Sequence, residues 1–580
     1  MRRKGHPMRG GGGLSAWVIL LVAVMLAALA VQCVTSLVTE TATLDELQFI
    51  GRGISHLMIG TAVWGPFLIG DHHAPLPFMF SAAPLLFTRG IQYPPCEAEW
   101  LHSGIWRFGR YFFFDLNMGR AEGMVNRCRC MTVLFSLLLA LLVFHFARKL
   151  HGTGAGLFAL FLQVFSPTVL AFSRYAVDPV YTAFFILLAV CAFHDYMRNP
   201  TARTLVFAGA AFGLAQLAKF SATLLIPCFV VLAAMDNVRE GGSRGLVGRL
   251  GGLALVFALG YLVVWAGYGF TTGSLSDVRI AEHFIGGRGA EWEFPDAARL
   301  SPAMFHPGRI PLVPYVRGLW ELWRHNRMGH PAFLMGEVSR NGWWYYYIVA
   351  FCIKSPIPLL ALLAMTVLLH RKFERGERPG DAYLIVPLCV TFGISLMSRQ
   401  ALGLRHIFVT YPLLHIYLSG VVTVRPSGAA ARVLLRLCLA ALCAWYLRGT
   451  VRIRPHYLAY FNEFIGGPKN GYKYLVDSNL DWGQDLKGVK GYMAEHHIDH
   501  ILFEHAGFSA FARYYGIDYE RLSDRLSRAR NPEEAHIKGV VMVSATARAD
   551  LWDPQRRLYR WISGYEPVDN IGYSILVYRF

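Results

Sequence analysis

The sequence predicts an all-α polytopic membrane protein with about eleven transmembrane helices, followed by a C-terminal soluble α/β domain. The first observation is apolar composition: the 580 residues are 54% hydrophobic and the mean hydropathy is +0.36. The second is low charge, because only 16% of residues are charged, against roughly 25% in soluble domains. The third is a change of pattern after residue 449, where short β-like runs alternate with helical stretches.

The apolar runs define the predicted membrane helices. A span needs about 20 mainly apolar residues, and the first run follows a basic N-terminus that we interpret as the flank of an uncleaved first helix. Two of the runs meet at Lys219, which predicts a broken pair. The predicted spans are 14–36, 128–147, 153–172, 176–194, 203–218, 221–235, 250–270, 344–369, 382–397, 406–424 and 431–449.

The net charge of +18 fits a membrane protein better than a nucleic-acid-binding protein, because Lys and Arg concentrate in alternate short loops. Such loops face the cytoplasm. The N-terminus is then cytoplasmic, and the other side receives three large segments. These are a first outer loop with interfacial helices (37–127), a second large loop (271–343) and the tail (450–580). Residues 1–449 form the predicted membrane domain.

The acidic pair Asp45-Glu46 follows the first span. One interpretation is a helix N-terminus, with Thr43 as the cap and the two acids in the first turn, where the helix dipole favours them. The other is functional, because carboxylates at the mouth of a membrane cavity are costly unless they are paired or used. Sequence alone leaves both open.

Several motifs together resemble one enzyme superfamily. TLDELQFIGRG around Asp45 is similar to the first-loop motif of lipid-phosphate-dependent GT-C glycosyltransferases, in particular family 39, which includes protein O-mannosyltransferases and lipid A aminoarabinose transferases. Four further stretches resemble family segments in family order, and the start of the tail resembles a bacterial subgroup. These stretches are SPTVLAFSRYAVDPVYTAFF (166–185), GLAQLAKFSATLLIP (213–227), HPAFLMGEVSRNGWWYYYIVAFCIKSPIPLL (330–360), LGLRHIFVTYP (402–412) and, in the tail, 455–492.

The resemblance implies transfer of a sugar from a polyprenyl phosphate to an acceptor, with inversion at the anomeric carbon. It assigns the role of base to Asp45, because the attacking hydroxyl must lose its proton to a nearby carboxylate. Glu46 is the second catalytic candidate, either orienting the acceptor or pairing with a cation. The leaving phosphate needs fixed cations in a site with little water.

Cations near the outer helix ends are the predicted phosphate ligands. Arg405 and His406 lie inside a matched motif, Lys219 interrupts an apolar region, and Arg174 follows Ser173 in the second outer turn. Snorkelling to lipid headgroups is the alternative for each cation. Further substrate-binding candidates are Asp178, which could instead pair with Arg174 one turn away, and Glu337, Lys354 and Arg52.

No metal or cofactor is required by this reading. The loop residues Asp71, His72, His73, Glu97, Glu99 and His102 offer a divalent-metal alternative that lacks the expected ligand spacing. The stretch VDSNLDWGQD (476–485) lacks the Gly and Glu of a calcium loop, so Asx turns and a helix cap are expected there.

The predicted function is therefore an inverting glycosyltransferase. The resemblance to a bacterial subgroup implies that it acts at the periplasmic face of a bacterial inner membrane, with the tail in the periplasm. Its partners are membrane lipids, a polyprenyl-phosphate sugar as donor substrate, and a protein, lipid or glycan acceptor, with no nucleic acid. The alternative is a transporter or flippase for lipid-linked sugars, in which the same cations would line a transport cavity. Such transporters carry broken helices at matching positions of two repeats, whereas this sequence has one such break.

Overall fold

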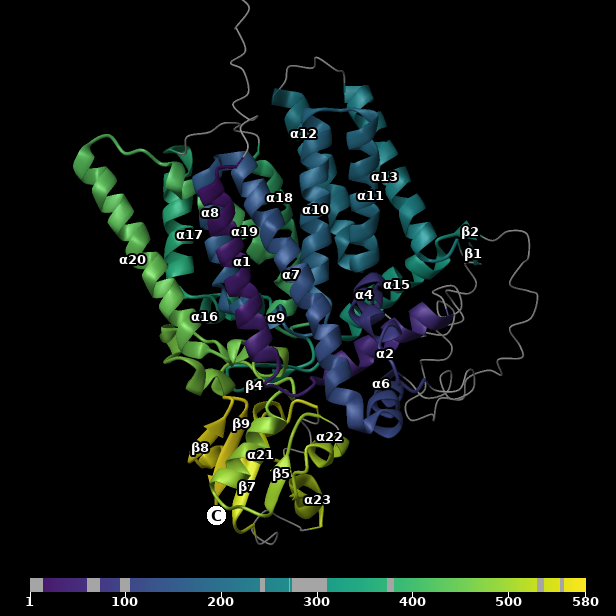
Figure 1. Cartoon of the computed structure of the whole chain (residues 1–580), viewed down its shortest axis with the longest axis vertical. Helices are drawn as coiled ribbons and strands as arrows, with labels where there is room; N and C mark the ends of the chain where they lie inside the picture. Colours follow the sequence, from purple (N-terminus) through teal and green to yellow (C-terminus); the bar gives the residue numbers. More distant parts are fainter. Residues whose placement is uncertain are drawn as a thin grey trace, which may run out of the picture.

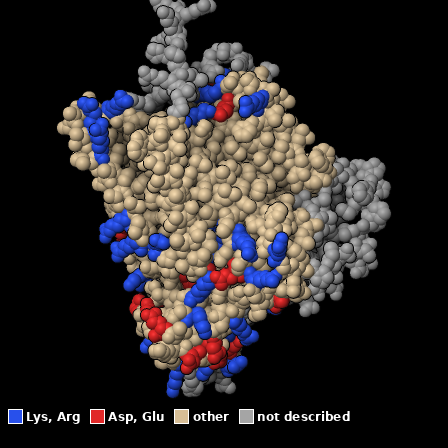
Figure 2. All heavy atoms as spheres, viewed as in Figure 1, with Lys and Arg blue, Asp and Glu red and all other residues tan. Residues whose placement is uncertain are grey.

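The computed structural model describes residues 14–59, 73–93, 105–239, 246–270, 272–273, 310–372, 380–507, 509–528, 537–552 and 558–580. It is mostly helical, with a bundle of apolar helices above a small sheet-containing tail (Figure 1). On the face shown in Figure 2, a broad band without charged residues separates basic residues at one end from mixed charges over the tail. This banding is the pattern of a multi-pass membrane protein.

The helices of the membrane part have a wide range of lengths. Two short 3₁₀ segments, η3 (Phe220–Leu224) and η7 (Leu404–Ile407), carry site residues. The α-helices are α1 (Ala16–Leu37), α2 (Leu44–Ile59), α4 (Leu76–Leu86), α6 (Ile105–Arg110), α7 (Ala121–His151), α8 (Thr153–Val164), α9 (Pro167–Phe172), α10 (Pro179–Arg198), α11 (Ala202–Ala218), α12 (Leu225–Arg239), α13 (Leu246–Gly267), α15 (Val313–Met328), α16 (Tyr346–Lys354), α17 (Ile357–Leu369), α18 (Ala382–Ser395), α19 (Thr410–Ser419) and α20 (Ala429–Ile453).

Eleven full-length spans are not confirmed. Among the described residues, five helices are long and apolar enough to cross a membrane, or six when a bent pair counts as one. The predicted span 153–172 is interrupted at Pro167, and 344–369 bends by 111° around Pro356. Proline lacks an N–H and keeps the preceding residue out of the helical region, so it divides apolar runs that hydropathy reads as continuous. The predicted break at Lys219 is present between α11 and η3.

The outer loops contribute two small antiparallel strand pairs and a compact helical layer. One pair joins β1 (Thr272–Gly273) to β2 (Ile310–Pro311), and the other is a hairpin of β3 (Ala332–Leu334) and β4 (Glu337–Ser339). In the layer, α2 packs on α4 and α6 beneath the bundle (Figure 1). Gly53 allows the close approach of α2 to α4, because a Cβ there would lie 2.0 Å from the carbonyl oxygen of Phe78.

The tail forms a five-stranded mixed sheet of order β6-β5-β7-β9-β8, in which β5 is parallel to β6 and β7 while β9 is antiparallel to β7 and β8. Three of these strands, β5, β7 and β9, coincide with the β-like runs of the sequence at 500–506, 539–547 and 574–580. The elements are α21 (Leu486–Glu495), β5 (Ile501–Glu504), α22 (Ser509–Tyr514), β6 (Tyr519–Arg521), α23 (Leu522–Ser527), β7 (Val540–Ser544), α24 (Ala545–Arg548), β8 (Asp569–Ile571) and β9 (Ile575–Arg579).

Candidate active site

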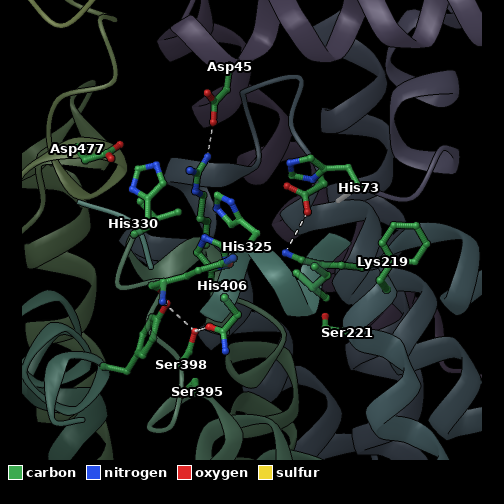
Figure 3. A pocket seen from close by; sticks show the side chains of 18 of the residues that line it. Asp45, His73, Lys219, Ser221, His325, His330, Ser395, Ser398, His406 and Asp477 are labelled. Atoms are coloured by element: carbon green, nitrogen blue, oxygen red, sulfur yellow. Dashed lines mark hydrogen bonds and ion pairs between the residues drawn. The ribbon is translucent and has the colours of Figure 1, made fainter. Parts of the chain in front are cut away.

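A cavity of about 870 Å³ lies where the helical bundle, the outer helices and the tail meet. Its walls come from α2, η3, α15, α18 and η7, and from the tail (Figure 3). Six predicted site residues line it: Asp45, Arg52, Asp178, Lys219, Arg405 and His406. The structure thus brings together residues that lie as far apart as 360 positions in the sequence.

Asp45 and Arg405 form an ion pair inside this cavity. Asp45 is in the first turn of α2, and its other carboxylate oxygen accepts a hydrogen bond from Gln48 Nε2 at 3.2 Å. The guanidinium of Arg405 lies over the Trp482 ring, 5.0 Å from its centroid. Both side chains are mostly buried, with 15% of Arg405 and 11% of Asp45 exposed, so their charges interact with little screening by solvent.

Glu46 points the other way, into the protein interior. Arg129 of α7 holds it with two hydrogen bonds of 2.8 Å, and both side chains are almost completely buried. Glu46 also accepts the backbone N–H groups of Thr43 and Ala176, each at 2.8 Å. Together with the Thr43 hydroxyl, this completes a capping box. Glu46 therefore has the capping role. Asp45 is the preceding residue, so its side chain points about 100° away around the helix axis, and it faces the cavity.

Two further cations face the cavity from other elements. Lys219 pairs with Asp178 at 3.0 Å, which corrects the expectation that Asp178 pairs with Arg174. Arg52 lies over the Phe78 ring, 5.6 Å from its centroid. His406 follows Arg405 in η7. Figure 3 shows Lys219 and His73 on one side of the cavity and Asp45 on another.

Four predicted residues do not line the cavity: Glu46, Arg174, Glu337 and Lys354. Arg174 is fully buried, pairs with Glu40 at 2.5 Å and lies over Tyr175. Lys354 is buried and donates to the carbonyls of Leu458 and Asn479 in the tail. Glu337 is exposed on the β3–β4 hairpin. Arg174 and Lys354 are therefore bound to protein groups, not placed to bind a phosphate.

The tail segment 477–484 is hydrogen-bonded to both elements that carry the Asp45–Arg405 ion pair. On one side, backbone N–H groups of Thr41 and Leu44 donate to the carbonyls of Gln484 and Trp482 at 2.8 and 3.2 Å. On the other, the Asn479 side chain accepts the N–H of Leu404 at 3.2 Å. The tail is therefore hydrogen-bonded to the starts of α2 and η7, which carry Asp45 and Arg405.

Asp477 is a cavity residue that sequence reasoning assigned to an Asx turn. Its carboxylate does accept the following N–H, from Ser478 at 2.5 Å, and its own N–H donates to the Thr546 hydroxyl at 3.0 Å. Burial raises the pKa of Asp477 to about 6, with the Asp45 charge adding to the shift and Arg405 opposing it. Nothing in the local sequence signals this environment, since Thr546 and Arg405 are far away in the chain.

Two histidines of the outer loop also line the cavity. Burial lowers the pKa of His325 to about 4 and lowers the pKa of His330, so both rings are neutral at pH 7. Their ring centroids are 5.8 Å apart, and His330 contacts the Trp552 ring of the tail. Neutral imidazoles can both donate and accept hydrogen bonds.

Most of the metal-binding alternative falls outside the described residues, namely Asp71, His72, Glu97, Glu99 and His102. His73 is described and lines the cavity. Elsewhere, Glu40, His456 and Asp485 offer ligand atoms within 4.8 Å of one another. However, the Glu40 oxygens already bind Arg174 and the Tyr175 hydroxyl, and Asp485 accepts from Ser574 at 2.6 Å. This cluster is explained by protein partners.

Comparison with known proteins supports the predicted resemblance. Residues 94–264 match the family model of dolichyl-phosphate-mannose-protein mannosyltransferase, a range that contains Arg174, Asp178 and Lys219. The match confirms the resemblance that the motifs predicted and indicates a glycosyltransferase. No curated protein matches the sequence.

Three solved structures are similar to the chain at low sequence identity. The ArnT protein of Cupriavidus metallidurans, determined with undecaprenyl phosphate, is 14% identical over 97% of this chain and 98% of that chain, with a TM-score of 0.48. The archaeal oligosaccharyltransferase AglB of Archaeoglobus fulgidus is 13% identical over 92% and 70%, with a TM-score of 0.46. The protein O-mannosyltransferase Pmt1-Pmt2 complex of S. cerevisiae is 11% identical over 75% and 90%, with a TM-score of 0.42.

Proposed function

We propose that the protein is an inverting glycosyltransferase that moves a sugar from a polyprenyl-phosphate donor to an acceptor on the periplasmic face of the membrane. The single observation that carries this proposal is the Asp45–Arg405 ion pair in a cavity that also holds Lys219, Arg52 and His406. A carboxylate and a group of cations in one cavity are what the reaction needs at its two ends.

The donor fits the membrane side of the cavity. Arg405, Lys219 and Arg52 bind the phosphate, since charge-assisted hydrogen bonds to phosphate are strong and Arg can bind it with two parallel donors. The first prenyl units lie along apolar side chains of the same wall. These are Leu224, Leu319, Leu322, Ile394 and Met397. Arg174 and Lys354 have no part in phosphate binding here, because they are buried against protein partners.

The ion pair gives the reaction an order of events. Without donor, Arg405 neutralises Asp45. A donor phosphate competes for the same guanidinium, so its arrival frees one oxygen of Asp45 to act as a base. The acceptor hydroxyl then attacks the anomeric carbon and its proton passes to Asp45. The bond from that carbon to the phosphate oxygen breaks, and its electron pair leaves with the polyprenyl phosphate. One displacement inverts the configuration.

Transfer by the Asp45→Asn variant is the direct test. Purified protein is incubated with radiolabelled undecaprenyl-phosphate mannose and with membranes from the native host as the acceptor source. We expect transfer to fall by about 10²- to 10⁴-fold, the usual contribution of a general base, while binding of undecaprenyl phosphate persists. The control is Asp115→Asn, which changes a half-exposed carboxylate outside the cavity. Transfer at the wild-type rate by Asp45→Asn would contradict the assignment.

The proposed orientation puts the tail and the outer helical layer in the periplasm of a bacterial inner membrane. Residues 1–449 then form the membrane domain and 450–580 the periplasmic domain. Figure 2 supports this orientation, because basic residues gather at the end of the molecule opposite the tail, as they do on the cytoplasmic side of membrane proteins. Protease accessibility of the tail in sealed spheroplasts measures this arrangement.

A further inference from the structure

The tail side of the cavity presents an aromatic surface. Trp552 is 50% exposed and lines the cavity. Its ring meets the His330 ring nearly edge-on, at a centroid distance of 5.5 Å and an interplanar angle of 86°. His330 is fixed in turn, because its Nδ1 lies 3.0 Å from the Pro331 carbonyl oxygen. About half of the Trp552 side chain therefore stays accessible beside His330.

A carboxylate without a cation partner lies on the same side. Arg405, whose charge opposes the raised pKa of Asp477, forms its ion pair with Asp45 instead. Among the described residues, no Lys or Arg forms an ion pair with Asp477. Figure 3 shows Asp477 next to His330, across the cavity from Lys219 and His73. Asp481 and Asp45 are the other acids that face this region.

The position of Asp477 is held by the tail itself. Its backbone N–H donates to the Thr546 hydroxyl, and the Thr546 N–H donates to Asp481 at 2.8 Å. Thr546 lies in α24, which ends four residues before Trp552. Asp477 has a positive φ of 56°, a conformation that Asp and Asn tolerate best among residues with side chains. Asp477 is therefore held by the segment that leads to Trp552.

We propose that Trp552, His330 and Asp477 form a saccharide subsite that holds one pyranose ring. The face of an indole is electronegative and meets the C–H groups of a pyranose face, while a carboxylate accepts hydrogen bonds from hydroxyl groups. The subsite deepens the proposed function and rests on it for its role. The bound ring belongs either to the donor or to a glycan acceptor, and a peptide acceptor would need neither group.

Saturation-transfer NMR on the full chain in a sugar-free detergent tests the subsite without depending on transfer. The probe is methyl α-D-mannopyranoside, and sorbitol, which has hydroxyl groups but no ring face, is the negative probe. We expect saturation of the ring protons for the pyranoside only. Trp552→Ala and Asp477→Asn should each weaken binding about fivefold, given the usual strength of aromatic and charge-assisted contacts.

Matched controls separate the subsite from general effects. Trp344→Ala removes an exposed indole outside the cavity, and Asp569→Asn removes an exposed tail carboxylate; both should bind the pyranoside like the wild type. Asn at 477 keeps the backbone conformation, so folding is preserved. An unchanged signal in Trp552→Ala, an equal signal from sorbitol, or no signal from the pyranoside would each overturn the proposal.

Undecaprenyl-phosphate mannose then identifies the source of the ring. If the ring is the donor's, the lipid displaces the pyranoside signal. If it is the acceptor's, the signal remains with the lipid bound. If the protein binds the pyranoside but transfers no sugar, the proposed function is wrong while the subsite stands.

Discussion

Glu46 and Arg129 provide a quantitative test of how two adjacent acids divide their roles. In Glu46→Ala, the Arg129 charge stays buried without its partner, which costs about 3–5 kcal/mol of unfolding free energy. The backbone N–H groups of Thr43 and Ala176 lose their acceptor as well, and each buried unsatisfied group adds about 1–3 kcal/mol. Since these terms are not additive, we expect a loss of about 5 kcal/mol, the lower end of total domain stability.

The assay is unfolding in detergent micelles, followed by circular dichroism and by the monodisperse fraction on gel filtration. Asp115→Ala is the comparison, since its pair with Arg110 is half exposed and should contribute less than about 1 kcal/mol. A double variant, Glu46→Leu with Arg129→Met, should recover part of the loss because it removes both buried charges. A stable Glu46→Ala protein without transfer activity would refute the structural assignment and return Glu46 to catalysis.

Three further predictions concern the cavity. Arg405→Ala should weaken binding of undecaprenyl phosphate about 10- to 100-fold, the worth of hydrogen bonds to a charged group, as measured by titration calorimetry; unchanged affinity would remove Arg405 from the phosphate site. Asp178→Asn should tighten phosphate binding in the same assay, because it releases Lys219 from its ion pair; weaker binding would mean that Asp178 positions Lys219. Asp477 has its pKa raised from 3.8 to about 6, so the folded state retains a proton that the unfolded state releases. Stability should therefore fall as pH rises between about 4 and 6 and stay at the lower level above that range. Asp477→Asn should lose this dependence in thermal unfolding curves, and an unaltered pH profile would contradict the raised pKa.

Local patterns predicted elements and single residues well. The break at Lys219 and the strands β5, β7 and β9 of the tail follow from hydropathy and residue pattern. The role of Glu46 was also readable, because Thr43-x-x-Glu46 is a capping-box pattern. Arg129 was missed, although a charge at the start of an apolar span is itself a sign of a buried partner.

Pairings across the chain could not be predicted in the same way. Asp178 was expected to pair with Arg174 because helical spacing allows it, yet the fold brings Lys219 closer. The sequence predicted only a turn at Asp477. Its place in the cavity depends on Thr546 and Arg405, which are distant in the chain and close in the fold. The predicted number of spans is not confirmed for a local reason, since the apolar runs that contain Pro167 and Pro356 are each divided into two helices.

Mass spectrometry of the lipid that co-purifies with the protein tests the central claim most directly. The proposal predicts a prenyl phosphate or prenyl-phosphate sugar bound to the wild type, with the mass of the attached sugar naming the donor. The same lipid should be lost from Arg405→Ala and kept by Asp45→Asn. Retention of bulk phospholipids alone by all three proteins would contradict the claim that this cavity binds a lipid-linked sugar.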